Sequence, residues 1–215
     1  MDKKYKLTDN FITHNGKKLF QIQAIKSFGD VSEGNLGGYI ENENNLSQDD
    51  NAWVYGDAWV YGNARVYGNA RVSCNAWVYG NARVSCNAWV YGNAWVYGNA
   101  RVYGDALVSG NASVFGNAWV YGNARVYGNA WVYGNAWVSG DASVYGDARV
   151  YFKGNYLTVG PFGNSRRTIT IGDNIVNAGC FSGTFEEFKN AVAKKYGNDY
   201  GSYAKAIQII DNIKF

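Results

Sequence analysis

The sequence predicts a mainly β protein in which many short strands are wound into a parallel solenoid. Three observations lead to this fold class: residues 51–152 divide into 17 consecutive hexads without an insertion, every hexad begins with Asn or Asp and most end in Gly, and the chain has 27 Gly but 1 Pro. A Gly in every sixth position would cost a helix roughly 1 kcal/mol each time. Flexible Gly-rich linkers lack aromatic residues, whereas this chain has 8 Trp and 18 Tyr.

Each hexad follows the pattern Asn/Asp, Ala, variable, Val, Tyr/Ser, Gly. In an extended segment Ala and Val point to one side, and the variable residue and Tyr point to the other. Gly followed by Asn or Asp adopts positive φ most readily, so we expect a corner there. A single short strand cannot bury its apolar side, and stacked coils solve that problem. We therefore expect Ala and Val inside and the variable residue and Tyr outside.

The hexads, of the form NAxVxG, resemble the hexapeptide repeat of left-handed parallel β-helices. This resemblance implies three hexads per coil and a left-handed prism, whereas ordinary parallel crossovers are right-handed. The segments GDVSEGNLGGYIENENNLS, residues 29–47, and GCFSGTFEEF, residues 179–188, resemble those that flank such arrays in phage and prophage proteins. The chain is thus similar to phage-type hexapeptide-repeat proteins.

With three hexads per coil, outward residues 18 positions apart share one face. The first face displays Trp53, Arg71, Trp89, Leu107, Arg125 and Ser143. The third displays Arg65, Arg83, Arg101, Trp119 and Trp137. The second displays Trp59, Trp77, Trp95, Ser113, Trp131 and Arg149. It is almost wholly aromatic, because its companion row is Tyr61, Tyr79, Tyr97, Phe115, Tyr133 and Tyr151.

Large exposed aromatic patches usually mark an interface. We therefore expect the second face to pack against another subunit or against the protein's own cap. The alternative is that its stacked rings only reinforce coil stacking. The Arg ladder of the third face could bind an acidic partner or a nucleic-acid backbone, but Asp57, Asp105, Asp141 and Asp147 at the corners dilute its charge. With a formal charge of only +3, we do not expect a nucleic-acid binder.

We expect three parts: an N-terminal β cap and lead-in over residues 1–44, the hexad array over 45–152, and a small α+β cap over 153–215. Asn15-Gly16 between alternating runs predicts a hairpin, with Phe20, Ile22 and Ala24 on one face and His14 an exposed strand residue. Thr184 and Glu187 fit a capping box that starts a helix. That helix is expected to run to Tyr196 and to stop at Gly197, with two short strands in 167–181 before it and more helix from Ser202.

The C-terminal cap holds the candidate small-molecule site. Two Gly-rich loops, residues 160–168 and 179–184, could converge if the strands between them fold back. Arg166 and Arg167 could hold a phosphate or carboxylate bidentately, and the helix N-terminus favours an anion. Alternatively, the Arg side chains are only solvated and Thr184 only caps the helix. The candidate residues are Gly163, Ser165, Arg166, Arg167, Thr168, Cys180, Ser182, Gly183 and Thr184.

We do not expect an enzyme. Many left-handed β-helix proteins are acyltransferases with a His base and an extruded loop, but the hexads contain neither His nor an insertion. Cys74, Cys86 and Cys180 have no zinc-site spacing, an odd count argues against disulfides, and we expect no metal or cofactor. With no signal-peptide or membrane-spanning pattern, we expect a cytoplasmic protein, in the host cytoplasm if it is phage-encoded.

The sequence thus predicts a non-catalytic β-solenoid binding protein, a homo-oligomer (dimer or trimer) that engages a protein partner or an anionic small ligand. One alternative is sequestration of a nucleotide-type signal by the C-terminal cap. A second alternative is a hexapeptide acyltransferase.

Overall fold

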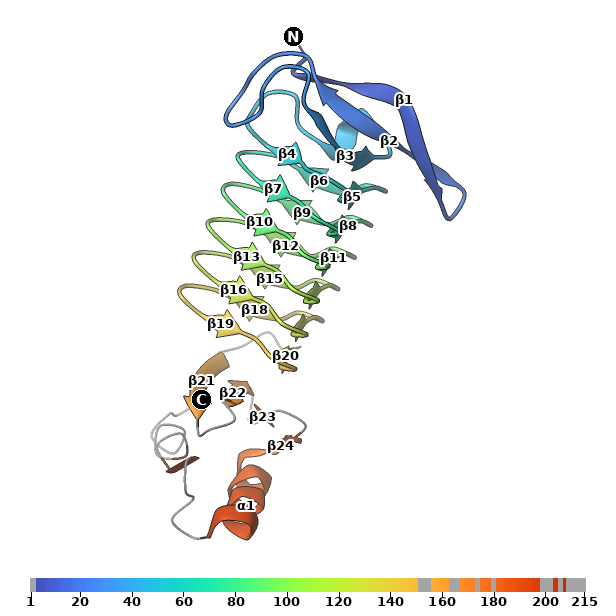
Figure 1. Ribbon diagram of the computed structural model, residues 1–215. Coiled ribbons are helices and arrows are strands. Elements are labelled where there is room, and N and C mark those ends of the chain that lie inside the picture. Colours follow the sequence, from blue (N-terminus) through green and yellow to red (C-terminus); the bar gives the residue numbers. More distant parts are fainter. Residues whose placement is uncertain are drawn as a thin grey trace.

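The computed structural model describes residues 3–150, 156–162, 167–172, 175–178, 181–197, 203, 204 and 207. A long parallel solenoid carries a β cap at its N-terminal end and a small α+β unit at the other (Figure 1). The predicted mainly β parallel solenoid is confirmed, and its left hand stays a prediction.

Each of the 17 hexads contributes one two-residue strand, and the strands form three flat faces. The first face contains β4 (Trp53–Val54), β7 (Arg71–Val72), β10 (Trp89–Val90), β13 (Leu107–Val108), β16 (Arg125–Val126) and β19 (Ser143–Val144). The second contains β5 (Trp59–Val60), β8 (Trp77–Val78), β11 (Trp95–Val96), β14 (Ser113–Val114), β17 (Trp131–Val132) and β20 (Arg149–Val150). The third contains β6 (Arg65–Val66), β9 (Arg83–Val84), β12 (Arg101–Val102), β15 (Trp119–Val120) and β18 (Trp137–Val138).

The interior consists of the hexad Ala and Val side chains, as predicted. All are buried except Ala142 and Ala148 near the C-terminal end, which are partly buried. Neighbouring coils are joined by backbone bonds that all run one way: the Trp77 N–H, for example, donates to the Ala94 carbonyl at 2.9 Å. N–H groups therefore point toward the C-terminal end of the solenoid and carbonyls toward the N-terminal end.

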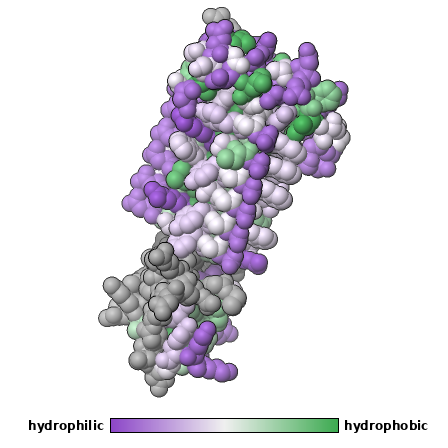
Figure 2. All heavy atoms as spheres, viewed as in Figure 1, coloured by the Kyte–Doolittle hydropathy of each residue, from purple (hydrophilic) through white to green (hydrophobic). Residues whose placement is uncertain are grey.

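The corners require backbone in the left-handed region. Gly62 has φ +70°, and a Cβ placed there would lie 3.2 Å from the backbone N and O of Gly80 in the next coil. Cys74 and Cys86 hold the same conformation, with φ of 61° and 58°, although they carry a side chain. Rows of like side chains run straight along the solenoid surface (Figure 2), as an 18-residue coil requires.

Asn side chains beside the corners form ladders in which each amide donates to the next coil. The Asn63 Nδ2 donates to Asn81 Oδ1 at 3.1 Å, and the Asn81 Nδ2 donates to Asn99 Oδ1 at 3.0 Å. An ionised Asp accepts but cannot donate, so an Asp ends a ladder, as Asp105 does after accepting from Asn87 at 2.9 Å.

The N-terminal cap continues the second face. Strands β1 (Tyr5–His14) and β2 (Lys17–Ala24) form the predicted hairpin, which turns at Asn15 and Gly16. Strand β3 (Leu36–Ile40) pairs with β2 and then in parallel with β5, and a 3₁₀ turn, η1 (Glu43–Asn45), follows. Ile22, Ala24 and Ile40 belong to the same buried core as the coils.

The C-terminal unit has its own sheet and core. Its antiparallel sheet contains β21 (Tyr156–Phe162), β22 (Arg167–Gly172), β23 (Ile175–Ala178) and β24 (Phe181–Thr184), followed by α1 (Phe185–Tyr196). The two strands predicted in 167–181 and both ends of the helix are confirmed. The second helical stretch expected from Ser202 lies outside the described residues, apart from 203, 204 and 207.

The predicted loop over 179–184 is wrong for residues 181–184, which form β24, and 160–162 likewise belong to β21. Gly183 explains the error at β24. A Cβ on Gly183 would lie 2.8 Å from Glu187 Oε2 and 2.9 Å from the Phe181 ring. This Gly therefore lets a strand run closely against the first turn of α1 and does not mark a loop.

Candidate functional site

The aromatic residues predicted for the second face form two stacked rows. Trp59 and Trp77 have ring centroids 4.6 Å apart, and Trp77 and Trp95 are 5.3 Å apart. The second row is continuous, with successive centroid distances of 5.0, 4.9, 4.8 and 5.0 Å along Tyr61, Tyr79, Tyr97, Phe115 and Tyr133. Burial, together with the neighbouring Tyr61 and Tyr97, raises the pKa of Tyr79 to about 12. Part of this face therefore reinforces coil stacking.

The tip of the hairpin covers the N-terminal end of these rows. The His14 ring lies 5.0 Å from that of Trp59 and 5.2 Å from that of Trp77. His14 is half-buried, so the expectation of an exposed side chain is wrong. The hairpin is held beside the coils by Glu41, whose carboxylate accepts from Lys17 Nζ at 2.7 Å and from the Gly62 N–H at 2.7 Å. The protein's own cap is thus one occupant of the second face.

Beyond the hairpin the face is open. Trp95 is 42% exposed and Trp131 is 41% exposed. Ser113 lies between them in strand register and has a much smaller side chain. The Trp131 ring packs edge-on against Phe115 at 6.0 Å, and Arg149 lies over its face at 4.9 Å. We call this part of the second face, made by Trp95, Ser113, Phe115 and Trp131, the aromatic notch.

The first face differs from the prediction at its first position. Trp53 is 1% exposed. Its ring packs edge-on against Tyr5 at 6.0 Å and Phe28 at 5.4 Å, because the cap folds over the first coil. Farther along, Arg71 lies over the Trp89 ring at 5.1 Å and pairs with Asp30 at 2.9 Å. The Arg71 side chain therefore packs on the Trp89 ring of the next coil.

The described residues of the C-terminal candidate site do not all lie close together. Gly163, Ser165, Arg166 and Cys180 lie outside them. Arg167 and Thr168 begin β22, whereas Thr184 pairs with Ile175, which pairs with Gly172 at the end of β22. Gly172 is five positions after Arg167, or about 17 Å along the strand. Arg167 and the helix N-terminus are therefore at opposite ends of the sheet.

The N-terminus of α1 is already occupied by a carboxylate of the same helix, that of Glu187. The Thr184 N–H donates to Glu187 Oε2 at 2.7 Å, and the Glu187 N–H donates to Thr184 Oγ1 at 3.3 Å. Glu187 Oε2 also accepts from Thr184 Oγ1 at 3.0 Å, and the two bonds that this oxygen accepts lower the pKa of the Glu187 carboxyl. Ser182, Gly183 and Thr184 thus form the last strand and the cap. The cavity nearby has about 100 Å³ and is lined mainly by apolar residues such as Phe181, Phe188 and Tyr203.

Neither a metal-binding cluster nor a membrane-spanning helix occurs in the described part of the chain. No group of three or more His, Cys, Asp or Glu side chains there could hold a metal ion. Within the same residues, no helix has the length and apolar character needed to cross a membrane.

A match to a known family lies in the coils. Residues 58–73, 64–79, 76–92, 88–104, 94–110, 100–116, 118–134 and 124–140 match the family described as YdcK beta solenoid repeat. The coils are similar to the YdcK repeat. This similarity and the parallel strand pairing agree that the chain is a repeat β-solenoid protein. No curated protein matches the chain.

Proposed function

We propose that this protein is a non-catalytic interaction protein that pairs with a second copy of itself through the aromatic notch. One observation carries the proposal. The stacked rows that bind His14 within the chain continue uncovered to Trp95 and Trp131. Exposed Trp and Tyr on a flat, rigid surface favour association.

The order of residues along the face favours a second copy as the partner. Counted outward from Ser113, the variable positions carry Trp95 on one side and Trp131 on the other. The companion row carries Tyr97 and Tyr133 around Phe115. A two-fold axis through Ser113 makes such a surface complementary to itself. Trp95 of each copy then lies over Trp131 of the partner subunit.

The hairpin limits this antiparallel arrangement to the coils of Trp95, Ser113 and Trp131. Its tip covers Trp59 and Trp77, three and two coils before Ser113. Across the axis, those coils correspond to positions at and beyond Arg149, which belongs to the last strand of the second face. The hairpin of one copy therefore faces the last coil of the other, and contact between the two second faces is confined to the three coils of the notch.

The mass of the protein in solution tests the proposal. We expect a dimer for the native chain and a monomer for Trp95→Ser/Trp131→Ser by light scattering after size exclusion. Trp89→Ser is the matched control, because Trp89 is 44% exposed at the same hexad position of the first face. It should remain dimeric. A native monomer at every concentration, or a dimer that survives the double substitution, contradicts the proposal.

A cross-link tests the geometry separately. Since Ser113 lies on the proposed axis, Ser113→Cys should form a disulfide with the same residue of the partner subunit on oxidation. The native chain is the control, because its exposed Cys74 and Cys86 lie at corners away from the axis. A dimer that does not cross-link at position 113 contradicts the antiparallel two-fold arrangement.

We also propose that the protein is of phage or prophage type and acts in the cytoplasm. It is supported by the resemblance of residues 29–47 and 179–188 to segments that flank phage repeat arrays. Catalysis as an acyltransferase is not favoured: the hexads contain no His, and the ring of His14 is packed on Trp59. Sequestration of a nucleotide by the C-terminal cap is not favoured either, since Arg167 and Thr184 lie apart.

A further inference from the structure

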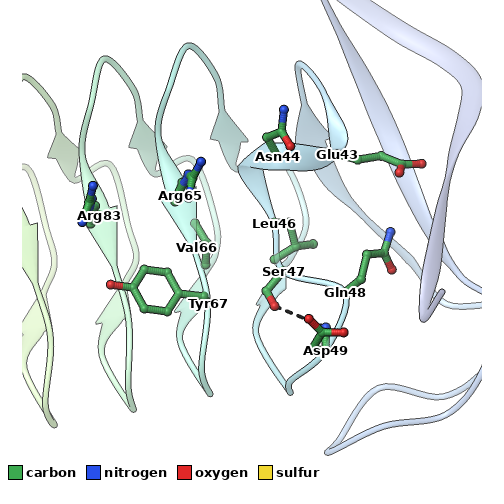
Figure 3. Close-up of a pocket in the computed structure, with 10 residues that line it drawn as sticks. All are labelled: Glu43, Asn44, Leu46, Ser47, Gln48, Asp49, Arg65, Val66, Tyr67 and Arg83. Atoms are coloured by element: carbon green, nitrogen blue, oxygen red, sulfur yellow. Dashed lines mark hydrogen bonds between the residues drawn. The ribbon is translucent and has the colours of Figure 1, made fainter. Parts of the chain in front are cut away.

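A polar groove of about 480 Å³ lies on the third face, where the lead-in meets the first coils (Figure 3). The segment from Glu43 to Asp49 forms one wall. Arg65, Tyr67 and Arg83 form the other, with the two Arg side chains side by side on neighbouring coils. A groove of this volume is within the range of small-molecule sites.

The groove exists because the lead-in, residues 29–47, pairs with the coils in a different register from that between neighbouring coils. Leu46 pairs with Val66, and the Ser47 N–H donates to the Val66 carbonyl at 2.9 Å, so the offset is 20 residues and not 18. This register places Ser47 opposite Tyr67, and Ser85 follows Tyr67 in the next coil. Tyr67 therefore has small neighbours on both sides and is 40% exposed. Its ring is available to a ligand.

The charges of the groove are not balanced within the described structure. Arg65, Arg83 and Arg101 lie directly opposite one another in β6, β9 and β12. Like charges in this relation repel and destabilise a sheet. Arg101 lies over the Trp119 ring at 4.9 Å. Among the described residues, the guanidinium groups of Arg65 and Arg83 have no ion pair, hydrogen bond or ring contact.

The acidic residues of the opposite wall do not neutralise them. Glu43 is paired with Lys3 Nζ at 2.7 Å, and its side chain extends away from Arg65 in Figure 3. The Asp50 carboxylate accepts from the Gly68 N–H at 2.6 Å and lies 3.7 Å from Lys4 Nζ. Asp49 is the other acidic residue that lines the groove.

We propose that this groove binds a linear oligophosphate, either free or as part of a nucleotide. Guanidinium groups bind phosphate oxygens with two parallel hydrogen bonds. Here they repeat in a line at the strand spacing of about 4.8 Å, so a ligand with several anionic groups in a row relieves the repulsion along the ladder. Asn44 and Ser47 supply polar groups on the facing wall, whereas the Gln48 amide is bonded to the backbone of Lys4 and Tyr5. The inference does not depend on self-association, because the aromatic notch is on another face.

Calorimetric titration with inorganic tripolyphosphate at physiological salt tests the site. We expect saturable binding to the native chain and a loss of at least about tenfold in affinity for Arg65→Gln/Arg83→Gln. Arg125→Gln is the matched control, because Arg125 is an exposed Arg at the same hexad position of the first face. It should bind as the native chain does. Absence of saturable binding, or equal binding by the double variant, overturns the proposal.

A second ligand distinguishes the two sources of the phosphate chain. If ATP binds more tightly than tripolyphosphate, and Tyr67→Ala removes that difference, the ligand is a nucleotide with its ring on Tyr67. If the two bind equally, the ligand is a free oligophosphate. Preference for a poly-glutamate peptide of equal charge overturns the proposal in favour of an acidic protein segment.

Thermal unfolding provides an independent readout of the same charges. Tripolyphosphate should raise the Tm of the native chain and leave that of Arg65→Gln/Arg83→Gln unchanged. Without ligand and at low salt, the double variant should unfold at an equal or higher temperature, since it has lost the repulsion. A ligand-free double variant less stable than the native chain contradicts unbalanced charges. Trp95→Ser/Trp131→Ser should still bind, which separates this site from the proposed dimer.

Discussion

The two ends of the solenoid are completed in different ways. At the N-terminal end, the hairpin and β3 extend the second face, and their apolar side chains join the core of the coils. At the C-terminal end, the unit has a separate four-stranded sheet and a separate core around Phe188 and Val192. One described contact across this junction is the bond from Asn177 Nδ2 to the Arg149 carbonyl, at 3.1 Å.

The direction of the backbone bonds explains what the N-terminal cap must provide. Because the carbonyls of the first coil point toward that end, the cap has to supply donors. The Tyr39 N–H donates to the Ala58 carbonyl at 2.9 Å, and the Asn45 Nδ2 donates to that of Ala64 at 2.9 Å. The buried Lys4 Nζ donates to the Asp50 and Ala52 carbonyls. A cap that shares the core of the coils must therefore supply donors for the carbonyls of the first coil. A unit with its own core need not do so.

The largest expected effect is a loss of stability of the solenoid and its N-terminal cap, without a loss in the C-terminal unit. Ile40→Ala removes a fully buried side chain shared by cap and coils and should lower the free energy of unfolding by about 2–5 kcal/mol. All 8 Trp lie between positions 53 and 137, so Trp fluorescence reports the solenoid. Its denaturation midpoint should fall.

The corresponding change at the other end is Ile169→Ala. Ile169 is also fully buried, but in the separate core. It should reduce the helical circular dichroism at lower denaturant and leave the Trp midpoint in place. A shift of the Trp midpoint by Ile169→Ala as large as that of Ile40→Ala would show that the two ends unfold together.

An intermediate effect comes from Lys4. Burial lowers the pKa of Lys4 from 10.5 to about 8, against the opposing attraction of Asp50. Between these values the unfolded chain binds a proton that the folded chain has released. Stability therefore rises with pH from about 8 to 10, by on the order of 1–3 kcal/mol. Burial raises the pKa of Tyr79 to about 12, so stability falls again above pH 10.

The measurement is the free energy of unfolding in urea at several pH values, for the native chain and for Lys4→Met. The substitution should remove the rise between pH 8 and 10. Lys189→Met is a control in the C-terminal unit, where Lys189 lies on the helix. An unchanged pH profile in Lys4→Met would exclude Lys4 as the source.

The smallest effect concerns the coils between the two ends. Asn99→Asp removes the amide that donates to Asn117 Oδ1 at 3.1 Å. It should cost about 1 kcal/mol, because one hydrogen bond is lost and two acceptors then face each other. Asn135→Asp is the matched control: Asn135 only accepts in this ladder, and position 153, one coil on, is a Lys. Equal losses in urea unfolding would mean that the ladder bonds do not stabilise the coils.

The coils were predictable from sequence because their period is local: the hexad fixes which side chains are buried and which residues stack. The caps were not, because Trp53 and His14 are covered by residues far away in the chain. The groove at Arg65 and Arg83 depends on the 20-residue offset of Leu46, which no repeat predicts. Gly183 led to an error of another kind. The sequence predicts a loop at this Gly, whereas the structure requires a Gly there because β24 packs closely against α1.

The 18-residue coil also determines how this chain can change length in evolution. The hexads share one sequence pattern, so recombination within the array is expected to add or remove hexads. A change of three hexads preserves every face and only moves the notch, the ladders and the C-terminal unit along the axis. A change of one hexad turns everything downstream by one face, which would separate Trp131 from Trp95 and Arg101 from Arg83. Selection on these surfaces should therefore tolerate gains and losses of whole coils and reject single hexads.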